Sequence, residues 1–328
     1  MKVLITGITG MVGSHLADYI LGNHPSVEIH GLVRWRSPLD NIRHIQSRVS
    51  LHQGELRDLY SLVFVLRRVR PDWIFHLAAQ SYVTTSFQAP TDTIHTNVIG
   101  TTNLLDAIRI IEIDAKVHIC SSSEVYGQVT RGEIPIRETN PFRPSSPYAV
   151  SKVGEDMIAL QYFLSYGIKT VRTRMFTHTG PRRGDVFAES AFAKQVAEVE
   201  AGIRCNPIRV GNLNSVRTFA DVRDAVRAYW LLLEKCPPGE VYNIGGTRTM
   251  TVGEMLELLK GMARCQIEHQ VDPGLLRPSD VTLQIPDTSK FQAATGWKPE
   301  ISLEETLTNL LNYHRSRVQA GKGRCNIV

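Results

Sequence analysis

A glycine-rich turn near the start of the chain constrains its fold more than any other feature of the sequence. Residues 3–6 form a short apolar run, glycines follow at positions 7, 10 and 13, and residues 11–21 carry apolar side chains at helical spacing. This order predicts a strand, a tight turn and a helix. Such glycines let a pyrophosphate approach the amide groups at the helix N-terminus, where the helix dipole favours negative charge. A plain tight turn is the alternative, but we expect a dinucleotide to contact Gly7, Thr9, Gly10, Met11, Val12 and Gly13.

Strand-like and helix-like segments continue to alternate through the first half of the chain. Strands are predicted at 27–33, 73–77, 116–121 and 169–174, and helices at 59–70, 91–111 and 147–165. This alternation is typical of an α/β fold with a doubly wound parallel sheet, the NAD(P)-binding Rossmann fold. The length of 328 residues, 42% of them hydrophobic, allows a large core.

The second half of the chain changes character and predicts a smaller, interleaved C-terminal substrate lobe. We expect residues 1–176 to form the dinucleotide-binding domain, to which the chain returns at about 219–248 because residues 241–246 resemble a further sheet strand. Residues 177–218 and 249–314 would then form the substrate lobe. The polar stretch 315–328 is expected to be a frayed tail.

Charge and composition exclude several classes of function. The 37 Lys and Arg residues against 32 Asp and Glu give a formal charge of +5, without like-charge runs, so no nucleic-acid partner is expected. Five cysteines without a CxxC pair indicate a reducing compartment, and no HExxH pair supports a metal site. Apolar stretches are too short to span a membrane. We therefore expect a cytoplasmic enzyme.

The residues after the second predicted strand indicate which dinucleotide binds. A carboxylate there would hold a ribose 2′-hydroxyl, whereas arginine accommodates a 2′-phosphate. The chain has Arg34 and Arg36 and no carboxylate, which favours NADP; two solvated surface arginines are the alternative. We also expect Glu55 and Leu56 to border the cofactor, together with residues at and after the end of the strand predicted at 73–77, namely Leu77, Ala78, Ala79 and Ser81.

A tyrosine and a lysine lie four residues apart on a predicted helix. Tyr148 and Lys152 therefore share one helix face, and Ser122 ends a strand some residues upstream. A nearby ammonium group favours phenolate, which would lower the pKa of Tyr148 from about 10 and make it a general base. This set predicts a proton-transfer site beside the dinucleotide.

With these motifs the chain resembles the extended short-chain dehydrogenase/reductase family over almost its whole length. The resemblance rests on the glycine turn, on residues 76–79, and on Ser122, Tyr148 and Lys152. It implies that Tyr148 and Lys152 both contact the cofactor, Lys152 at the nicotinamide ribose. It also implies that Ser122 assists Tyr148 and that the substrate is a nucleotide sugar. It further implies a homodimer or homotetramer, in which the segment 35–45 reaches a neighbour's cofactor.

Within this family the chain is most similar to the GDP-mannose 4,6-dehydratases, and next to the GDP-4-keto-6-deoxymannose reductases. Residues 32–37, 78–83, 122–124 and 178–184 carry the first resemblance, whereas the Ala-rich segment 187–202 resembles the reductases. The resemblance implies that His178 and Arg183 contact NADP. It implies a GDP-sugar site at Ser81, Val83, Ser122, Glu124, Tyr148, Thr177, Lys194, Gly211, Asn212, Arg217, Arg277 and Asp280.

Glu124 bears on the choice between these activities. A dehydratase needs an additional acid/base group to move the C5 proton, and Glu124 lies two residues beyond Ser122. A solvated loop carboxylate is the alternative for Glu124. Arg217 and Arg277 suit a diphosphate, although either could instead pair with a surface carboxylate. The hypotheses are thus a dehydratase, a reductase, an epimerase or dehydratase of another nucleotide sugar, or a redox-inert NADP-binding protein.

Overall fold

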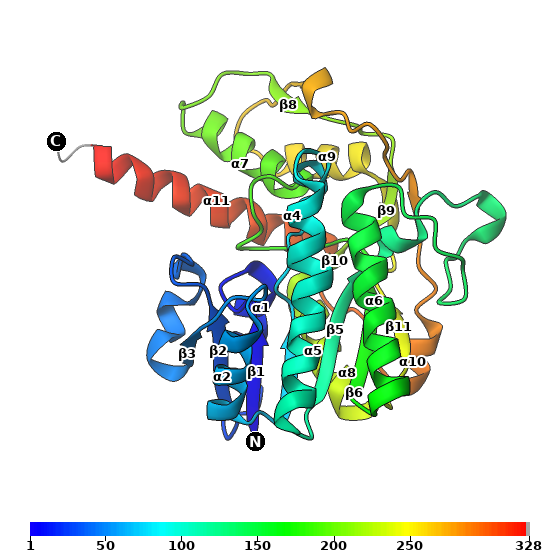
Figure 1. The fold of residues 1–328 in the computed structure, drawn as a ribbon. Helices are drawn as coiled ribbons and strands as arrows, with labels where there is room; N and C mark the ends of the chain where they lie inside the picture. Colours follow the sequence, from blue (N-terminus) through cyan, green and yellow to red (C-terminus); the bar gives the residue numbers. More distant parts are fainter. Residues whose placement is uncertain (326–328) are drawn as a thin grey trace.

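A seven-stranded parallel sheet forms the centre of the molecule (Figure 1). The computed structural model describes residues 1–325, with side chains for residues 1–320. The strands follow the order β11-β6-β5-β4-β1-β2-β3, and every neighbouring pair is parallel. The strand order reverses between β1 and β4, and in open α/β sheets this is where a crevice for a ligand opens at the carboxyl ends of the strands.

The chain alternates between strands and helices through most of its length. The strands are β1 (Lys2–Thr6), β2 (Glu28–Val33), β3 (Ser50–Gln53), β4 (Trp73–His76), β5 (Lys116–Ser122), β6 (Lys169–Met175), β7 (His178–Thr179), β8 (Ile208–Val210), β9 (Val216–Thr218), β10 (Ala220–Asp221), β11 (Val241–Ile244), β12 (Thr249–Thr251), β13 (His269–Val271) and β14 (Leu283–Gln284). The α-helices are α1 (Met11–Asn23), α2 (Leu59–Val69), α3 (Val83–Gln88), α4 (Pro90–Ile94), α5 (Gly100–Ile111), α6 (Pro147–Tyr166), α7 (Ala188–Glu200), α8 (Val222–Lys235), α9 (Val252–Gly261), α10 (Ser289–Thr295) and α11 (Leu303–Cys325).

Two hydrophobic cores cover the two faces of the sheet, as a doubly wound fold requires. Helices α1 and α8 pack on one face, where Leu16, Ile20 and Tyr229 are buried. Helices α2, α5 and α6 pack on the other face around residues such as Leu66 and Leu104 (Figure 1). The predicted Rossmann architecture is confirmed, and it holds the carboxyl ends of the strands together at one edge.

The helix predicted at 91–111 is divided into three parts. Helix α4 is followed by one π-helical turn, His95–Ile99, and then by α5. The turn contains Asn97, whose side chain accepts a hydrogen bond from Gln80 N at 2.8 Å and donates one to Gln80 O at 2.9 Å. These bonds fix the segment after β4. A single π-helical turn within an α-helix is frequently found at a functional site.

A smaller lobe lies over the carboxyl ends of the sheet strands (Figure 1). Its own core joins α7, β8, α9 and the first part of α11 around residues such as Phe192, Leu256 and Leu307. The chain leaves this lobe to form α8 and β11, and β11 pairs with β6 at the edge of the large sheet. The two lobes are therefore interleaved along the chain.

The expectation of a frayed tail from residue 315 is wrong for the described residues. Helix α11 continues to Cys325, and Arg315 donates to Glu200 from Nε at 2.7 Å and from Nη2 at 2.6 Å. This bidentate pair anchors the helix to α7, which a polar composition alone does not reveal. Residues 326–328 lie outside the described residues.

Candidate active site

The glycine turn after β1 forms the floor of the predicted dinucleotide crevice. Gly7 has a positive φ of 72°, and a Cβ atom at Gly13 would lie 2.3 Å from the Gly7 carbonyl oxygen. Gly10 caps α1 without a side chain, so the first amide groups of the helix stay accessible. Only glycine therefore fits at positions 7 and 13. The turn leaves the N-terminus of α1 exposed, where it is suited to bind a pyrophosphate.

A cavity of about 550 Å³ extends over this turn. The structure brings nearly all of the predicted cofactor residues to its wall, namely Gly7, Thr9, Gly10, Met11, Val12, Gly13, Arg34, Glu55, Leu56, Leu77, Ala78, Ala79, Ser81, Lys152, His178 and Arg183. Arg36 does not belong to this wall, because its guanidinium stacks on the exposed Trp35 ring at 4.1 Å. Arg34 is thus the arginine placed to meet a 2′-phosphate.

The end of β2 fits a phosphorylated ribose. Arg34 lines the cavity beside Ser37, whose hydroxyl accepts a hydrogen bond from Arg34 N at 3.0 Å. Among the described residues, no carboxylate forms an ion pair with Arg34, so its charge stays available. Glu55, at the end of β3, is 3.8 Å from Arg57 Nε. The residues therefore accommodate a pyridine dinucleotide with a 2′-phosphate.

Helix α6 positions the tyrosine and the lysine. Its N-cap is Ser146, which accepts a hydrogen bond from Ala149 N at 3.0 Å, and Pro147 occupies the first turn. This start places Tyr148 and Lys152 on one buried face, with the ammonium 5.9 Å from the centre of the phenol ring. The Ser122 hydroxyl hydrogen-bonds the Tyr148 phenol. The three predicted residues therefore form one cluster.

The acidity of Tyr148 differs from the expectation. Burial raises its pKa above 10, and the opposing effects of Lys152 and of the Ser122 hydrogen bond do not cancel that rise. The expected fall in the pKa is therefore wrong. Lys152 lowers the pKa of Tyr148, as predicted, but its ammonium group also forms an ion pair with a second buried residue, Glu155.

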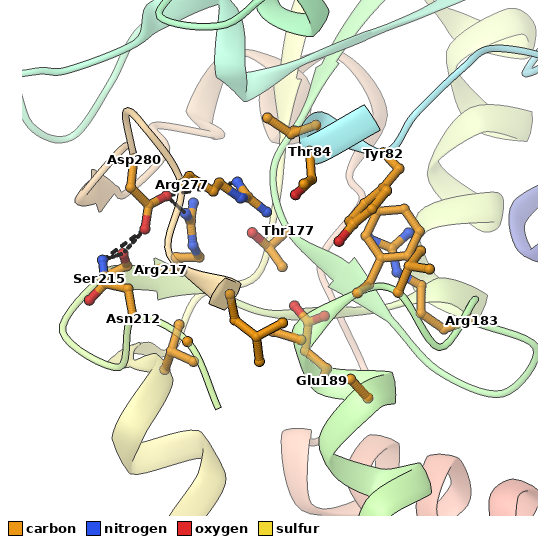
Figure 2. Close-up of a pocket in the computed structure, with 18 of the residues that line it drawn as sticks. Tyr82, Thr84, Thr177, Arg183, Glu189, Asn212, Ser215, Arg217, Arg277 and Asp280 are labelled. Atoms are coloured by element: carbon orange, nitrogen blue, oxygen red, sulfur yellow. Dashed lines mark hydrogen bonds and ion pairs between the residues drawn. The ribbon is translucent and has the colours of Figure 1, made fainter. Parts of the chain in front are cut away.

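A second cavity, of about 500 Å³, adjoins the first (Figure 2). Its wall shares Ser81, His178 and Arg183 with the cofactor cavity, so the two spaces meet there. The predicted substrate residues on its wall are Ser81, Val83, Ser122, Glu124, Tyr148, Thr177, Gly211, Asn212, Arg217, Arg277 and Asp280. Proton-transfer groups and cations thus line one continuous space.

The far end of this cavity carries two arginines around one carboxylate. Arg217 and Arg277 lie 3.6 Å and 3.8 Å from Asp280, which also accepts hydrogen bonds from Asn212 at 2.7 Å and Ser215 at 3.2 Å (Figure 2). Asp280 holds the arginines near each other without neutralising both of them. The arrangement leaves a net positive site, suited to a diphosphate.

A short chain of hydrogen bonds connects this cationic end to Glu124. Arg217 donates to the Gln284 side-chain oxygen, and Gln284 Nε2 donates to Glu124 Oε1 at 3.3 Å. Glu124 N also donates to Ser122 Oγ at 3.2 Å. Glu124 is thus held on the cavity wall beside Ser122, and it is not a solvated loop carboxylate.

His178 and Arg183 lie where the two cavities meet. Burial, together with the Arg183 guanidinium, lowers the pKa of His178 to about 4, so the imidazole is neutral near pH 7. Arg183 stacks on the Phe187 ring at 3.5 Å, and its Nε atom is buried without a hydrogen-bond partner in the described part of the chain. A cation with an unused donor at this junction fits an anionic ligand.

Lys194 and Glu189 differ from the sequence-based expectations. Lys194 is not on the substrate cavity wall, because its ammonium pairs with Asp185 at 2.5 Å. Glu189, which the sequence analysis missed, is buried and points into the cavity near Thr177 (Figure 2). A glutamate in the first turn of a helix commonly stabilises the helix by interacting with its dipole. The position of Glu189 in the sequence therefore does not indicate a ligand site.

Metal sites and membrane-spanning helices each have a characteristic geometry with which the described residues can be compared. Among them, no cluster of three or more His, Cys, Asp or Glu side chains is arranged to bind a metal ion. Over the same part of the chain, none of the helices combines the length and apolar character needed to cross a bilayer.

The fold and the site together define an enzyme of the extended short-chain dehydrogenase/reductase type with a pyridine-nucleotide crevice. A sequence profile of the GDP-mannose 4,6 dehydratase family matches residues 4–310, and the chain belongs to that family. It is 32% identical to a GDP-mannose 4,6-dehydratase of Yersinia enterocolitica, over 94% of this chain and 92% of the relative.

A reductase is about as similar to the chain. The GDP-6-deoxy-D-mannose reductase of Pseudomonas aeruginosa is 32% identical, over 97% of this chain and 98% of the relative. The solved structure of RMD from Pseudomonas aeruginosa, complexed with NADPH, has a TM-score of 0.84 and 31% identity, covering 96% of this chain and 99% of that one. Overall sequence similarity therefore shows the family but does not separate dehydratase from reductase activity. The residues of the site must distinguish these two reactions.

Proposed function

We propose that the protein is a GDP-mannose 4,6-dehydratase that forms GDP-4-keto-6-deoxymannose and water with bound, recycled NADP. The observation that carries this proposal is the position of Glu124. It lies in the same cavity as Ser122 and Tyr148, and Gln284 ties it to the cationic end of that cavity. A carboxylate at this place supplies the additional proton transfer that separates elimination from simple reduction.

The residues of the chain divide the reaction between them. When bound beside Tyr148 and Lys152, the nicotinamide would supply the hydride chemistry for oxidation at C4 of the mannose ring and reduction at C6. Tyr148 removes the proton of the C4 hydroxyl, with Ser122 hydrogen-bonded to the phenol. Glu124 then removes the C5 proton, which the C4 ketone has made acidic, and delivers it to the departing C6 hydroxyl, which leaves as water. When C6 is reduced, C5 takes up a proton from solvent through Glu124, and Tyr148 releases to solvent the proton that it took from the C4 hydroxyl. The sequence is redox-neutral, and its other product is water.

Substrate binding is separated in space from the chemistry. Arg217 and Arg277, at the far end of the cavity, are placed to hold the diphosphate. The sugar would then lie toward Thr177, Tyr148 and Glu124. Binding of the diphosphate at the far end of the cavity would fix the position of the sugar, although the two arginines would not contact the reacting carbons.

One assay distinguishes a dehydratase from a reductase. Purified protein with GDP-mannose and NADP, but no added reductant, should accumulate the keto sugar with no net formation or loss of NADPH. Absence of product, together with NADPH consumption when the keto sugar is supplied, would assign the reductase activity instead. That second candidate is favoured by the match to the Pseudomonas aeruginosa reductase over nearly its full length.

The cofactor preference follows from the end of β2. Arg34 lines the crevice at the end of β2, and among the described residues no carboxylate forms an ion pair with it, which supports NADP over NAD. Titration of the protein with each dinucleotide should give tighter binding of NADP, and Arg34→Ser should remove most of the difference.

The assembly we propose is a homodimer, with a homotetramer as the alternative. Ile110 on α5 and Val150, Met157 and Leu164 on α6 are exposed apolar side chains on two helices that pack together. Exposed apolar residues grouped on one face mark an interaction surface. Light scattering should report the mass of a dimer or tetramer, and Leu164→Glu should reduce it.

The location we propose is the cytoplasm. The cysteines with described side chains, Cys120, Cys205, Cys236 and Cys265, are free thiols, as a reducing compartment favours. Cell fractionation would test this assignment.

A further inference from the structure

Lys152 has a buried anionic partner that the proposed reaction does not use. Its Nζ atom donates to Glu155 Oε2 at 2.9 Å and to the Cys120 carbonyl oxygen at 2.9 Å. The two side chains are only 6% and 2% exposed. An ammonium group has three donors, so two are committed to fixed acceptors and one remains for the cofactor crevice, which Lys152 lines.

Stability alone does not account for Glu155. Its Oε1 atom is buried and has no hydrogen-bond partner among the described residues. The next residue, Asp156, is also buried, but its two oxygens are bound by Arg172 at 2.7 Å and Arg174 at 2.8 Å. A buried ion pair with an unsatisfied oxygen contributes little to stability, and an apolar pair is often as stable. Asp156 is therefore the structural carboxylate, and Glu155 needs another explanation.

The charged and titratable groups around Glu155 determine whose pKa its carboxylate can change. On its own helix, Lys152 and Asp156 are the charges that act on Glu155, and Glu155 in turn acts on the Tyr148 phenol and on the Cys120 thiol of β5. The Tyr229 phenol of α8 lies 3.4 Å from that thiol. His76 and His118, the other titratable groups near Lys152, are neutral near pH 7, since burial lowers the pKa of each to about 3. Among the described residues, Glu155 is thus the one carboxylate that forms an ion pair with Lys152.

We propose that Glu155 is a positioning residue for Lys152: it fixes the ammonium against β5, and its negative charge reduces the effect of that ammonium on Tyr148. The proposal rests on the proposed function only in taking Tyr148 as the proton-transfer group. In this arrangement Glu155 keeps Lys152 protonated and leaves one N–H for the cofactor. It also makes the Tyr148 phenol a weaker acid than the lysine alone would make it.

The protonation states are compatible with this role. Burial raises the pKa of Glu155 to about 7, and burial also raises the pKa of Tyr148 from its usual value of about 10. Glu155 is therefore ionised when Tyr148 titrates. Burial acts to lower the pKa of Lys152, but Glu155, Tyr148 and Cys120 outweigh it and the pKa is raised, so the ammonium persists over the same range.

The size of the effect follows from the distances above. Because Lys152 Nζ is 5.9 Å from the centre of the Tyr148 ring and 2.9 Å from Glu155 Oε2, the carboxylate oxygen lies at most about 9 Å from that centre. At this separation a unit charge in a medium of effective dielectric constant about 20 moves a pKa by about one unit. Replacing Glu155 by a neutral residue should therefore lower the pKa of Tyr148 by about one unit. The volume and the hydrogen bond to Lys152 can be kept by glutamine.

The test follows the titration of Tyr148 itself by NMR with ¹³C-labelled tyrosine, in the NADP complex, with Tyr148→Phe to assign the signal. Glu155→Gln should move the titration about one pH unit lower. Asp156→Asn, the matched control, should lower the melting temperature and leave the titration near the wild-type value. Glu155→Met serves the same test if the glutamine variant does not fold.

An unchanged titration in the Glu155 variant, or an equal shift in the Asp156 variant, would overturn the proposal. A merely structural role would change stability and not this titration. The measurement needs no turnover, so it stands apart from the proposed function. If GDP-mannose is not converted but the titration shifts, the proposed function fails and the role of Glu155 remains.

Discussion

Replacing Glu124 by glutamine isolates the step that distinguishes a dehydratase from a reductase. The change preserves the volume of the side chain and an oxygen that can accept from Gln284 Nε2, now 3.3 Å from Glu124 Oε1. The backbone contact from residue 124 to Ser122 Oγ is unaffected because it uses the amide nitrogen. What is lost is the capacity to accept and release the C5 proton.

A positioned general base contributes about 10²- to 10⁴-fold to a rate, which corresponds to about 3–5 kcal/mol of barrier. We therefore expect Glu124→Gln to reduce keto-sugar formation by at least about 100-fold. Oxidation at C4 depends on Tyr148 and should persist, so NADPH should accumulate in a single turnover. Incorporation of solvent deuterium at C5 should fall in parallel with product formation.

Glu189→Gln provides the matched control, because Glu189 is a second carboxylate on the wall of the same cavity. It should alter the KM for the sugar nucleotide more than the exchange at C5. If Glu124→Gln exchanges C5 and forms product at near the wild-type rate, the assignment of Glu124 as the base is refuted.

The remaining predictions concern the cofactor crevice, the cationic end of the substrate cavity and one buried histidine. Gly13→Ala should abolish dinucleotide binding in a calorimetric titration, because its Cβ would lie 2.3 Å from the Gly7 carbonyl oxygen; tight binding would contradict this. Arg217→Ala should raise the KM for the sugar nucleotide at least about tenfold, whereas Lys194→Ala, outside the cavity, should leave it unchanged. Burial lowers the pKa of His118 to about 3, so the unfolded state binds its proton first as the pH falls below about 6.5. The free energy of unfolding should therefore decrease from pH 6.5 toward pH 3, by about 2 kcal/mol at pH 5 from this residue, and His118→Phe should reduce that slope in chemical denaturation.

The crevice was predictable from the sequence because its signals are local. A glycine turn, a strand end and an i, i+4 pair each fix their own geometry, so Gly7, Gly13, Tyr148 and Lys152 reach the expected places. The π-helical turn at His95–Ile99 was not predictable, since its reason is a tertiary contact with Gln80.

The predictions that were wrong at the site concern the direction of long side chains and the pKa of Tyr148. Arg34 and Arg36 are equivalent in the sequence, but stacking of Arg36 on Trp35 removes it from the crevice. Lys194 turns to Asp185, a partner nine residues away that no short motif indicates. The acidity of Tyr148 depends on burial and on Glu155, and neither quantity can be read from the spacing of a tyrosine and a lysine.

The most direct test of the account is the fate of the hydrogen at C4 of the sugar. GDP-mannose deuterated at C4 should yield a 4-keto-6-deoxy product that carries the deuterium at C6, with no net reduction of NADP, because hydride leaves and returns within one bound complex. Recovery of unchanged substrate, or a product without deuterium at C6, would contradict the assignment of this site to an internal redox elimination.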